Sequence, residues 1–290
     1  MQIVTDRGMD LSPQQLAELT LHFVPLQIIL DGKSYSSGED LQPDEFYRLL
    51  EQTSSFPTTS QPSVEEFARL YRKLAENDPE ILSIHISSGL SGTINTARAA
   101  AESVPEAHIT IVDSLSLSAP FGWQVEAAAR AIKAGWSMEK IVCMLERLRT
   151  ETRGIFTLAT MKYLIHGGRI SHIRGLLASM LNIKPVIAVE TVHGTYAEMG
   201  KELTLKRAIQ KIVDVVQGWY PDGTKLRVQP LHGNNLEGVE ILRQRLLQAF
   251  SVHWEPVTAI APVLGAHTGP TLVGMAVAPQ SVFEDLHLTN

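Results

Sequence analysis

A loop rich in hydroxyl groups and glycine occupies residues 87–93 and directly follows the apolar run of residues 81–86. A helix is expected to follow, so the loop directs backbone N–H groups and hydroxyls toward a helix N-terminus, where the dipole favours an anion. The best donors are the hydroxyl of Ser91 and the N–H groups of Gly92 and Thr93. These residues predict a docking place for a carboxylate or a phosphate. An ordinary strand–helix turn with a serine cap fits the same residues.

The spacing within this loop disfavours two familiar kinds of site. The segment Gly89-Leu90-Ser91-Gly92 lacks the G-x-S-x-G spacing of a nucleophile elbow, which disfavours a serine hydrolase. It also lacks the Gly-Lys-Ser/Thr of a phosphate-binding P-loop. What remains is a site that holds an anion by hydrogen bonds.

A second group of hydroxyls lies between two prolines, in the run Pro57-Thr58-Thr59-Ser60-Gln61-Pro62. Because Pro62 restricts the residue before it to extended backbone, the run cannot be helical there. Extended backbone alternates side-chain directions, so Thr59 points one way while Thr58 and Ser60 point the other. A polar loop that only caps the next helix is the alternative.

Two further segments carry one ionisable candidate each. Arg169 follows two glycines, and its forked, permanently charged guanidinium suits an oxyanion. A structural ion pair across a domain boundary fits Arg169 equally well. His267 lies in the run 265–270, which we expect to be a loop between the last two strands. There it either faces a cleft, as a neutral donor or an imidazolium, or lies in the turn without a role.

The elements that position these segments alternate between strand and helix in the first half of the chain. Strands are expected at residues 3–5, 25–30, 81–86 and 109–112, and helices at 12–19, 44–52, 64–76 and 94–102. Short buried strands separated by amphipathic helices predict a mostly parallel sheet with helices. Ser63 and Glu66 predict a capping box at the start of the third helix. Two more helices are expected at 121–134 and 138–150.

The pattern changes near residue 151. Extended runs at 184–190 and 195–199, joined by a loop that holds Gly194, predict a hairpin. A helix at 204–217, a strand at 226–230, a helix at 236–250, and strands at 256–262 and 271–278 complete the chain. The prediction is an α/β fold with two domains. Residues 1–152 hold the mostly parallel sheet with helices, and residues 153–290 hold a mixed or antiparallel sheet with helices.

The composition excludes several classes of protein. A formal net charge of −6, with no run of Lys or Arg, argues against nucleic-acid binding. The single cysteine, Cys143, rules out an internal disulfide, and its helical spacing predicts a buried position. No apolar run reaches the ~20 residues that span a bilayer and no signal peptide is visible, so we expect a cytoplasmic protein without stable membrane insertion. His166 and His172 lack zinc-ligand spacing, and neither a metal nor a cofactor is expected.

Taken together and in this order, these segments resemble the DegV family of bacterial fatty-acid-binding proteins. The resemblance runs essentially end to end, through Ile3-Val4-Thr5-Asp6, Val24-Pro25-Leu26, residues 59–63 and 87–93, Val112-Asp113-Ser114, Tyr163-Leu164, residues 167–171, Ile183-Lys184-Pro185 and residues 265–270. It implies a two-domain α/β protein with a fatty acid in a tunnel between the domains. The ligand implied is a long-chain acid of about C16–C18, whose tail contributes about 0.8 kcal/mol for each buried methylene.

The resemblance also implies roles for single residues. In the family, the threonine of the T-S-Q-P-S motif and the serine of the S-G-T motif hold the carboxylate, and these correspond to Thr59 and Ser91. The further ligand-binding residues implied are Ser60, Gly92, Arg169 and His267. An apolar tunnel that is already open is required for the tail, since opening a packed core would cancel the gain from burial. Its candidate lining is Gly175, Leu176, Leu177, Ala178, Ser179, Met180, Leu181 and Ile183, for which an ordinary core helix is the alternative.

Some members of the family act as the lipid-carrying subunit of a fatty acid kinase, whose separate ATP-binding subunit phosphorylates the bound carboxylate. The resemblance therefore implies a lipid carrier that is not itself an enzyme, with such a subunit as its partner. The sequence departs from the family pattern at Arg7, Leu203 and Thr271. Leu203 stands where the family has a phosphate-handling arginine, so the kinase role depends on another cation. A free-standing acyl- or phosphoryl-transfer enzyme that uses Ser91 and His267 is the competing interpretation.

Overall fold

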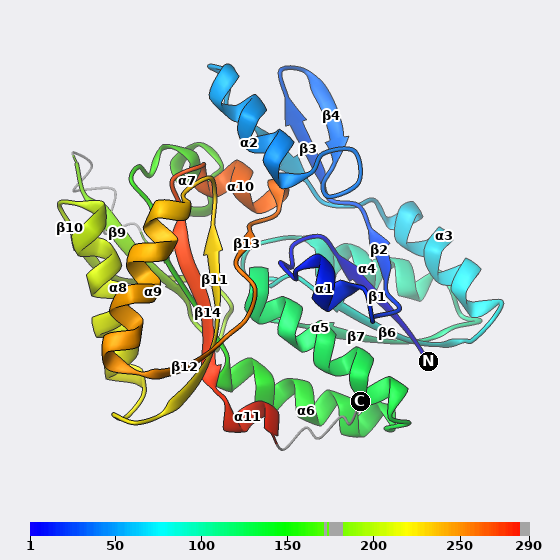
Figure 1. Ribbon diagram of the computed structural model, residues 1–290. Helices are drawn as coiled ribbons and strands as arrows, with labels where there is room; N and C mark the ends of the chain where they lie inside the picture. Colours follow the sequence, from blue (N-terminus) through cyan, green and yellow to red (C-terminus); the bar gives the residue numbers. More distant parts are fainter. Residues whose placement is uncertain (171–172, 174–181, 285–290) are drawn as a thin grey trace.

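The computed structural model describes residues 1–170, 173 and 182–284, which form two large sheets and one small sheet with helices around them (Figure 1). The first large sheet is parallel throughout, in the order β2-β1-β6-β7. Its strands are β1 (Gln2–Asp6), β2 (His22–Val24), β6 (Glu80–His85) and β7 (His108–Asp113). The mostly parallel sheet predicted for the first half of the chain is confirmed.

Helices α3 (Val64–Ala75) and α4 (Thr93–Glu102) pack together against this sheet. Their apolar side chains, among them the fully buried Phe67, form a cluster with the strands. The predicted capping box opens α3: Ser63 Oγ accepts from the Glu66 N–H at 3.2 Å, and the Glu66 carboxylate accepts from the Ser63 N–H at 2.7 Å. The start of α3 is thereby fixed directly after the hydroxyl run.

A small antiparallel sheet, in the order β4-β3-β5, lies near the top of Figure 1 and carries Thr59. Its strands are β3 (Gln27–Leu30), β4 (Lys33–Ser36) and β5 (Thr58–Ser60), and α2 (Pro43–Gln52) lies between β4 and β5 in the chain. The strand predicted at 25–30 is present as β3, but its expected place in the parallel sheet is wrong, because it pairs antiparallel with β4 and β5. The chain leaves that sheet at β2 and turns back after β3 through Asp31-Gly32, whose φ angles of 52° and 75° suit a two-residue hairpin turn.

The second large sheet is mixed, as predicted, in the order β10-β9-β8-β14-β11-β12, with β13 beside the end of β11. Its strands are β8 (Arg153–Thr157), β9 (Lys184–Val189), β10 (Tyr196–Glu202), β11 (Lys225–His232), β12 (Ser251–Trp254), β13 (Thr258–Ala259) and β14 (Val273–Pro279). Only the pairings of β11 with β12 and β13 are parallel. The hairpin predicted around Gly194 is β9–β10.

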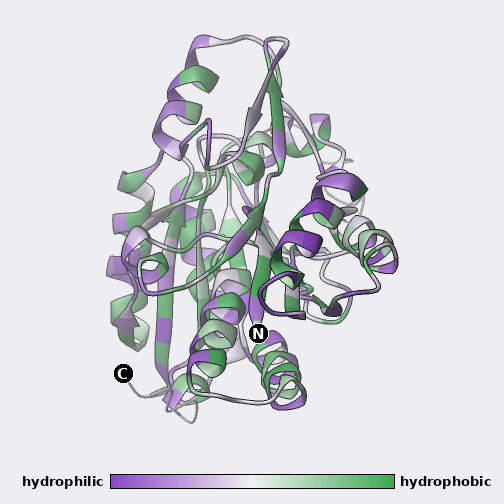
Figure 2. Ribbon diagram, turned by 90° about the vertical axis from the view of Figure 1, so that its right-hand side faces the viewer, coloured by the Kyte–Doolittle hydropathy of each residue, from purple (hydrophilic) through white to green (hydrophobic). Residues whose placement is uncertain are grey.

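Helices cover both faces of this second sheet. One face packs on α8 (Leu205–Trp219) and α9 (Leu236–Ala249). The other packs on α5 (Ser118–Lys133), which lies between the two large sheets and is followed by α6 (Met138–Glu151) (Figure 1). The largest apolar cluster accordingly joins residues of both halves, with Ile84, Phe121 and Ile187 among its members. Hydrophobic residues line the facing sides of these helices and strands in Figure 2.

The remaining short helices are α1 (Pro13–Leu16), α7 (Lys162–His166), α10 (Pro262–Thr268) and α11 (Ser281–Glu284). The strand predicted at 256–262 is wrong beyond β13, and the loop predicted at 265–270 is mostly helix. Pro262 occupies the first turn of α10, where its missing N–H has no cost, so the chain turns helical there. Cys143 is exposed on α6 rather than buried. Within the described ranges, none of the helices is long and apolar enough to cross a bilayer.

A buried carboxyl group fixes where α10 begins. Asp10 accepts hydrogen bonds from Ser118 Oγ at 2.5 Å and from the Ala261 N–H at 2.7 Å. Burial raises the pKa of Asp10 to about 7, and the two hydrogen bonds act in the opposite direction. Asp10 thus joins the N-terminal ends of α5 and α10, and α10 carries His267 on its last turn.

Candidate functional site

A pocket of about 260 Å³ brings together five of the six predicted ligand-binding residues, which come from β5, the loop after β6, the segment after α7, and α10. They are Thr59, Ser60, Ser91, Arg169 and His267. Gly92 lies instead on an adjoining hollow of about 350 Å³, which shares Leu90, Ser91 and Arg169 with the pocket. Four segments far apart in the sequence therefore meet at one place.

Thr59 and His267 form a hydrogen bond across the pocket wall. Thr59 is held on β5 by pairing with Ile28 of β3, and its Oγ1 lies 2.8 Å from His267 Nε2. The imidazole is 8% exposed, and its other nitrogen, Nδ1, is buried without a hydrogen-bond partner among the described residues. Gly167 leaves room for this ring, because a Cβ there would overlap Nδ1.

Burial keeps the His267 imidazole neutral. Desolvation, and then the positive charge of Arg169, lower the pKa of His267 to about 3. A neutral imidazole has one N–H, and a buried N–H without an acceptor is the rarer and costlier arrangement. We therefore assign the proton to Nε2, which donates to Thr59 Oγ1. The Thr59 hydroxyl hydrogen is then free to be donated to a guest in the pocket.

Ser91 sits directly before α4. Its N–H donates to Ser87 O at 3.0 Å, and its Oγ accepts from the Thr93 N–H at 3.3 Å and lies 2.9 Å from Thr93 Oγ1. When the Thr93 hydroxyl donates to Ser91, the Ser91 hydroxyl hydrogen is free for a guest. Ser87 ties this loop to the β9–β10 turn, because its hydroxyl donates to Gly194 O at 2.8 Å. The serine cap considered from the sequence is not formed, because the N-cap residue of α4 is Gly92 and it makes no side-chain capping bond; Ser91 instead makes a local turn with Thr93, which leaves its hydroxyl available to a guest.

Arg169 lines the pocket and the adjoining hollow, as Ser91 does. Its Nη1 donates to Gly167 O at 2.6 Å, and among the residues that the structure describes no carboxylate pairs with it. The structural ion pair weighed from the sequence is therefore not observed. The guanidinium is close enough to lower the pKa of His267 and to oppose the rise that burial causes in the pKa of Tyr196. It supplies positive charge to the pocket.

The far wall of the pocket is apolar. Leu117, Tyr196 and Leu264 line both the pocket and a second cavity between α5 and the mixed sheet, whose wall is almost entirely apolar. That cavity measures about 30 Å³, which is much narrower than the open tunnel expected. Of the predicted lining at 175–183, residues 175–181 lie outside the described part of the chain, and Ile183 packs against the main apolar cluster.

Two departures from the family pattern lie away from the pocket wall. Arg7 stacks on Phe23, with its guanidinium carbon 3.6 Å from the ring centroid, and burial lowers its pKa. Leu203 is 67% exposed. Sequence reasoning gave no role to Gln61, which lines the pocket and binds Thr96. Its place inside the T-S-Q-P-S motif was the available signal.

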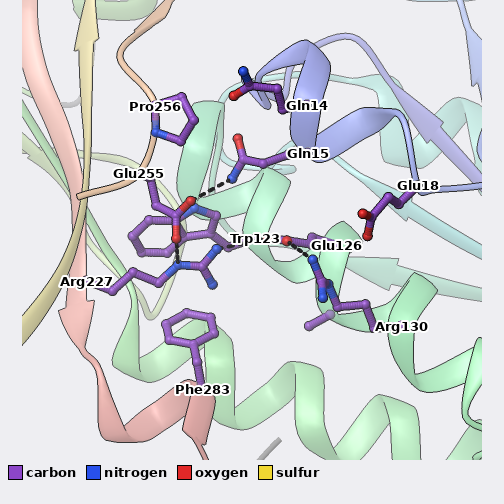
Figure 3. Close-up of a pocket in the computed structure, with 11 residues that line it drawn as sticks. Gln14, Gln15, Glu18, Trp123, Glu126, Arg130, Arg227, Glu255, Pro256 and Phe283 are labelled. Atoms are coloured by element: carbon purple, nitrogen blue, oxygen red, sulfur yellow. Dashed lines mark hydrogen bonds and ion pairs between the residues drawn. The ribbon is translucent and has the colours of Figure 1, made fainter. Parts of the chain in front are cut away.

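A larger pocket of about 440 Å³ lies elsewhere, where α1, α5, β11 and α11 meet (Figure 3). Its floor is Arg227, whose guanidinium lies 4.6 Å from the Trp123 ring centroid and 4.3 Å from that of Phe283. Arg227 Nη2 donates to Glu126 at 3.0 Å and Nε to Glu255 at 2.7 Å. The sequence offered no local pattern for this cluster. Its buried charges are paired with one another, so we assign this cluster a structural role in holding these elements together.

Comparisons with known proteins identify relatives along nearly the whole chain. The model of the DegV protein family matches residues 1–280. A DegV domain-containing protein of Staphylococcus aureus strain N315 is 34% identical over 280 residues, which is 95% of this chain and 97% of that protein. A Thermus thermophilus DegV family protein, described as fatty acid binding, has a TM-score of 0.87 at 33% identity, covering 96% and 99% of the two chains. A stearic acid-binding protein of Eubacterium ventriosum has a TM-score of 0.84 at 27% identity, covering 97% and 99%.

Proposed function

The chain belongs to the DegV family, and from this premise we propose that it binds a long-chain fatty acid and holds the carboxylate with Thr59 and Ser91. Structural neighbours of this family bind fatty acids. The observation that carries the proposal is a pocket whose one end offers hydroxyls and Arg169, and whose other end is apolar. A molecule with an anionic head and a hydrocarbon tail matches both ends.

The tail supplies most of the binding free energy in this proposal. Burying about 14 methylenes at about 0.8 kcal/mol each gives a gross contribution of roughly 11 kcal/mol. Each hydrogen bond to the charged head adds only about 1.5–3 kcal/mol. The head therefore sets orientation. Leu117, Tyr196 and Leu264 must separate to admit the tail into the apolar cavity, and the free energy of that opening is subtracted from the gross contribution of the tail. We place this ligand between two domains, residues 1–152 and 153–290.

The remaining assignments follow from position around the proposed carboxylate. Thr59 donates the hydroxyl hydrogen that His267 leaves free, and Ser91 donates its own. Arg169 supplies charge at the mouth, Ser60 extends the polar rim, and Gly92 lies on the outer hollow. The proposed ligand is an acid of about C16–C18, the length that the likeness to fatty-acid-binding relatives suggests, one of which is described as binding stearic acid.

An enzyme that uses Ser91 as nucleophile and His267 as base is less well supported. Such a pair needs the two side chains within hydrogen-bond reach of each other. In this structure His267 Nε2 faces Thr59, and Ser91 Oγ faces Thr93. We therefore propose a lipid carrier. A further part of the proposal is that the protein presents the acid to an ATP-binding kinase subunit. Because the exposed Leu203 has no charge where the family has an arginine, another cation must bind the phosphate in that reaction.

Native mass spectrometry of the purified chain tests the proposal directly. We expect a bound mass that denaturation releases as a C16–C18 fatty acid, and rebinding of stearic acid by the delipidated protein. The Thr58→Val variant, whose side chain is exposed and does not line the pocket, is the matched control and should bind normally. A delipidated protein that fails to bind stearic acid, or one that hydrolyses a long-chain ester, would contradict the proposal.

A further inference from the structure

The side chain of Gln61 bridges the two segments that carry the proposed carboxylate ligands. Its Nε2 donates to Thr96 Oγ1 at 2.6 Å, and Thr96 is buried in the first turn of α4. Thr96 Oγ1 in turn donates to Gly92 O at 3.4 Å. The amide of Gln61 thus rests on the backbone that directly follows Ser91.

The contact with Gln61, and not the backbone angles, explains why residue 92 is a glycine. Its φ of −76° and ψ of −1° are open to any residue, so conformational freedom does not require glycine here. A Cβ at this position would overlap Gln61 Oε1. The missing side chain of Gly92 is therefore the space that the Gln61 amide occupies.

The backbone of Gln61 transmits the contact to Thr59. The two residues are two positions apart in extended backbone, so their side chains leave the strand on the same side. Pro62 is buried and restricts Gln61 to extended backbone. Anchoring the Gln61 amide on α4 consequently fixes the end of β5 relative to the Ser91 loop.

We propose that Gln61 is a positioning residue that sets the separation between the Thr59 and Ser91 hydroxyls. This inference rests on the proposed function, because those hydroxyls are the proposed carboxylate ligands. In this proposal Gln61 acts through those two hydroxyls and not as a ligand itself, and one N–H of its amide is donated to Thr96. Its contribution is to hold two donors at the spacing that one carboxylate spans.

Hydrogen exchange of the delipidated protein tests the positioning without any ligand. We expect Gln61→Ala to speed exchange of the amides in residues 88–93, because the loop loses the contacts of the Gln61 amide with Gly92 and Thr96. Thr96→Val, which removes only the acceptor hydroxyl, should do the same, and Thr96→Ser should restore slow exchange. Unchanged exchange in both Gln61→Ala and Thr96→Val would overturn the inference. A protein that binds no fatty acid but shows the faster exchange would contradict the proposed function alone.

Binding measurements then separate positioning from general damage to the pocket. Gln61→Ala should weaken stearic acid by about threefold to tenfold, the range for one net hydrogen bond, and should change stearyl alcohol, with its single oxygen, by less than about twofold. Equal losses for acid and alcohol would overturn the inference. Gly92→Ala should weaken stearic acid in the wild-type background by displacing the Gln61 amide, and should have no further effect in Gln61→Ala. Losses that multiply in the double variant would show that the two residues act independently and would overturn the inference.

Discussion

Two pockets in the described part of the chain, the Arg227 pocket and the Thr59 pocket, treat buried polar groups in opposite ways. In the Arg227 pocket, the guanidinium is enclosed by two aromatic rings and paired with two carboxylates from different halves of the chain. In the Thr59 pocket, His267 has one nitrogen that finds no partner among the described residues, and two hydroxyls retain hydrogens that can be donated. The first pocket is the larger, yet the second has the groups that a guest could satisfy.

The contrast between the Arg227 pocket and the Thr59 pocket shows that volume alone does not identify a binding site. A buried charge is costly unless its hydrogen bonds are made, so a cluster that pairs its own charges is already complete. An incomplete cluster retains that cost until a ligand arrives. The Arg227 pocket should therefore respond to mutation through stability, and the Thr59 pocket through affinity.

The largest expected effect breaks the completed cluster. Arg227→Ala removes the enclosed guanidinium from two largely buried carboxylates, and leaves Glu126 with only the more exposed Arg130. It should lower the free energy of unfolding by up to about 3–5 kcal/mol. Urea denaturation followed by circular dichroism measures the loss. Stearic acid affinity of the folded variant should be unchanged. A loss below about 1 kcal/mol would contradict the structural role, because that is the range of an exposed pair.

The second effect uses the ionisation of His267. Its pKa is lowered by burial and then by Arg169 to about 3, from 6.5. As pH falls below 6.5, His267 becomes protonated in the unfolded chain but stays neutral in the folded protein. The free energy of unfolding therefore decreases by at most about 1.4 kcal/mol per pH unit until pH approaches 3. Above pH 6.5 this group makes no difference.

Comparison of the wild type with His267→Gln isolates this proton. Asp10 has the opposite sign, since its raised pKa of about 7 lowers stability as pH rises above 3.8, but it is present in both proteins and cancels. Urea unfolding at about pH 7 and about pH 4.5 should show a steeper loss for the wild type. Parallel losses in the two proteins would mean that His267 is not held neutral.

The third effect belongs to the incomplete pocket. Thr59→Val and Ser91→Ala should each weaken stearic acid binding by about 1.5–3 kcal/mol, because each removes one donor to the carboxylate, and the double variant Thr59→Val/Ser91→Ala should lose more than either. Unfolding free energy should fall less than in Arg227→Ala, because both side chains are partly exposed. Isothermal titration measures the affinity. Unchanged affinity in this double variant would remove the head-group assignment.

Sequence reasoning predicted the parallel sheet because each short apolar strand is followed by an amphipathic helix, a pattern that local residues determine. It missed the β3–β4 hairpin because the short polar run of β4 was not recognised as a strand, although Asp31-Gly32 marks the turn before it. It missed α10 because a segment with two glycines resembles a loop. All seven residues of that helix are buried, so tertiary packing stabilises it.

The residues of the Thr59 pocket could be predicted from the sequence, whereas those of the Arg227 pocket could not. The Thr59 pocket consists of short contiguous motifs, so its residues were named before their convergence was known. In the Arg227 cluster each segment contributes only one or two side chains, and Trp123, Arg227 and Phe283 are separated by more than 50 residues each. Side-chain contacts over such separations depend on the fold and have no local pattern.

The smallest expected effect sharpens the distinction within the completed cluster itself. Arg130 pairs with the same carboxylate as Arg227, at 3.0 Å from Glu126 Oε1, but its side chain is 37% exposed against 12% for Arg227. Because water replaces much of what an exposed ion pair provides, Arg130→Ala should lower the unfolding free energy by only about 0–1 kcal/mol. Urea denaturation beside Arg227→Ala gives a matched comparison on one shared partner. Equal losses for the two variants would mean that burial does not separate them, and that Glu126, rather than the enclosed guanidinium, dominates the cluster.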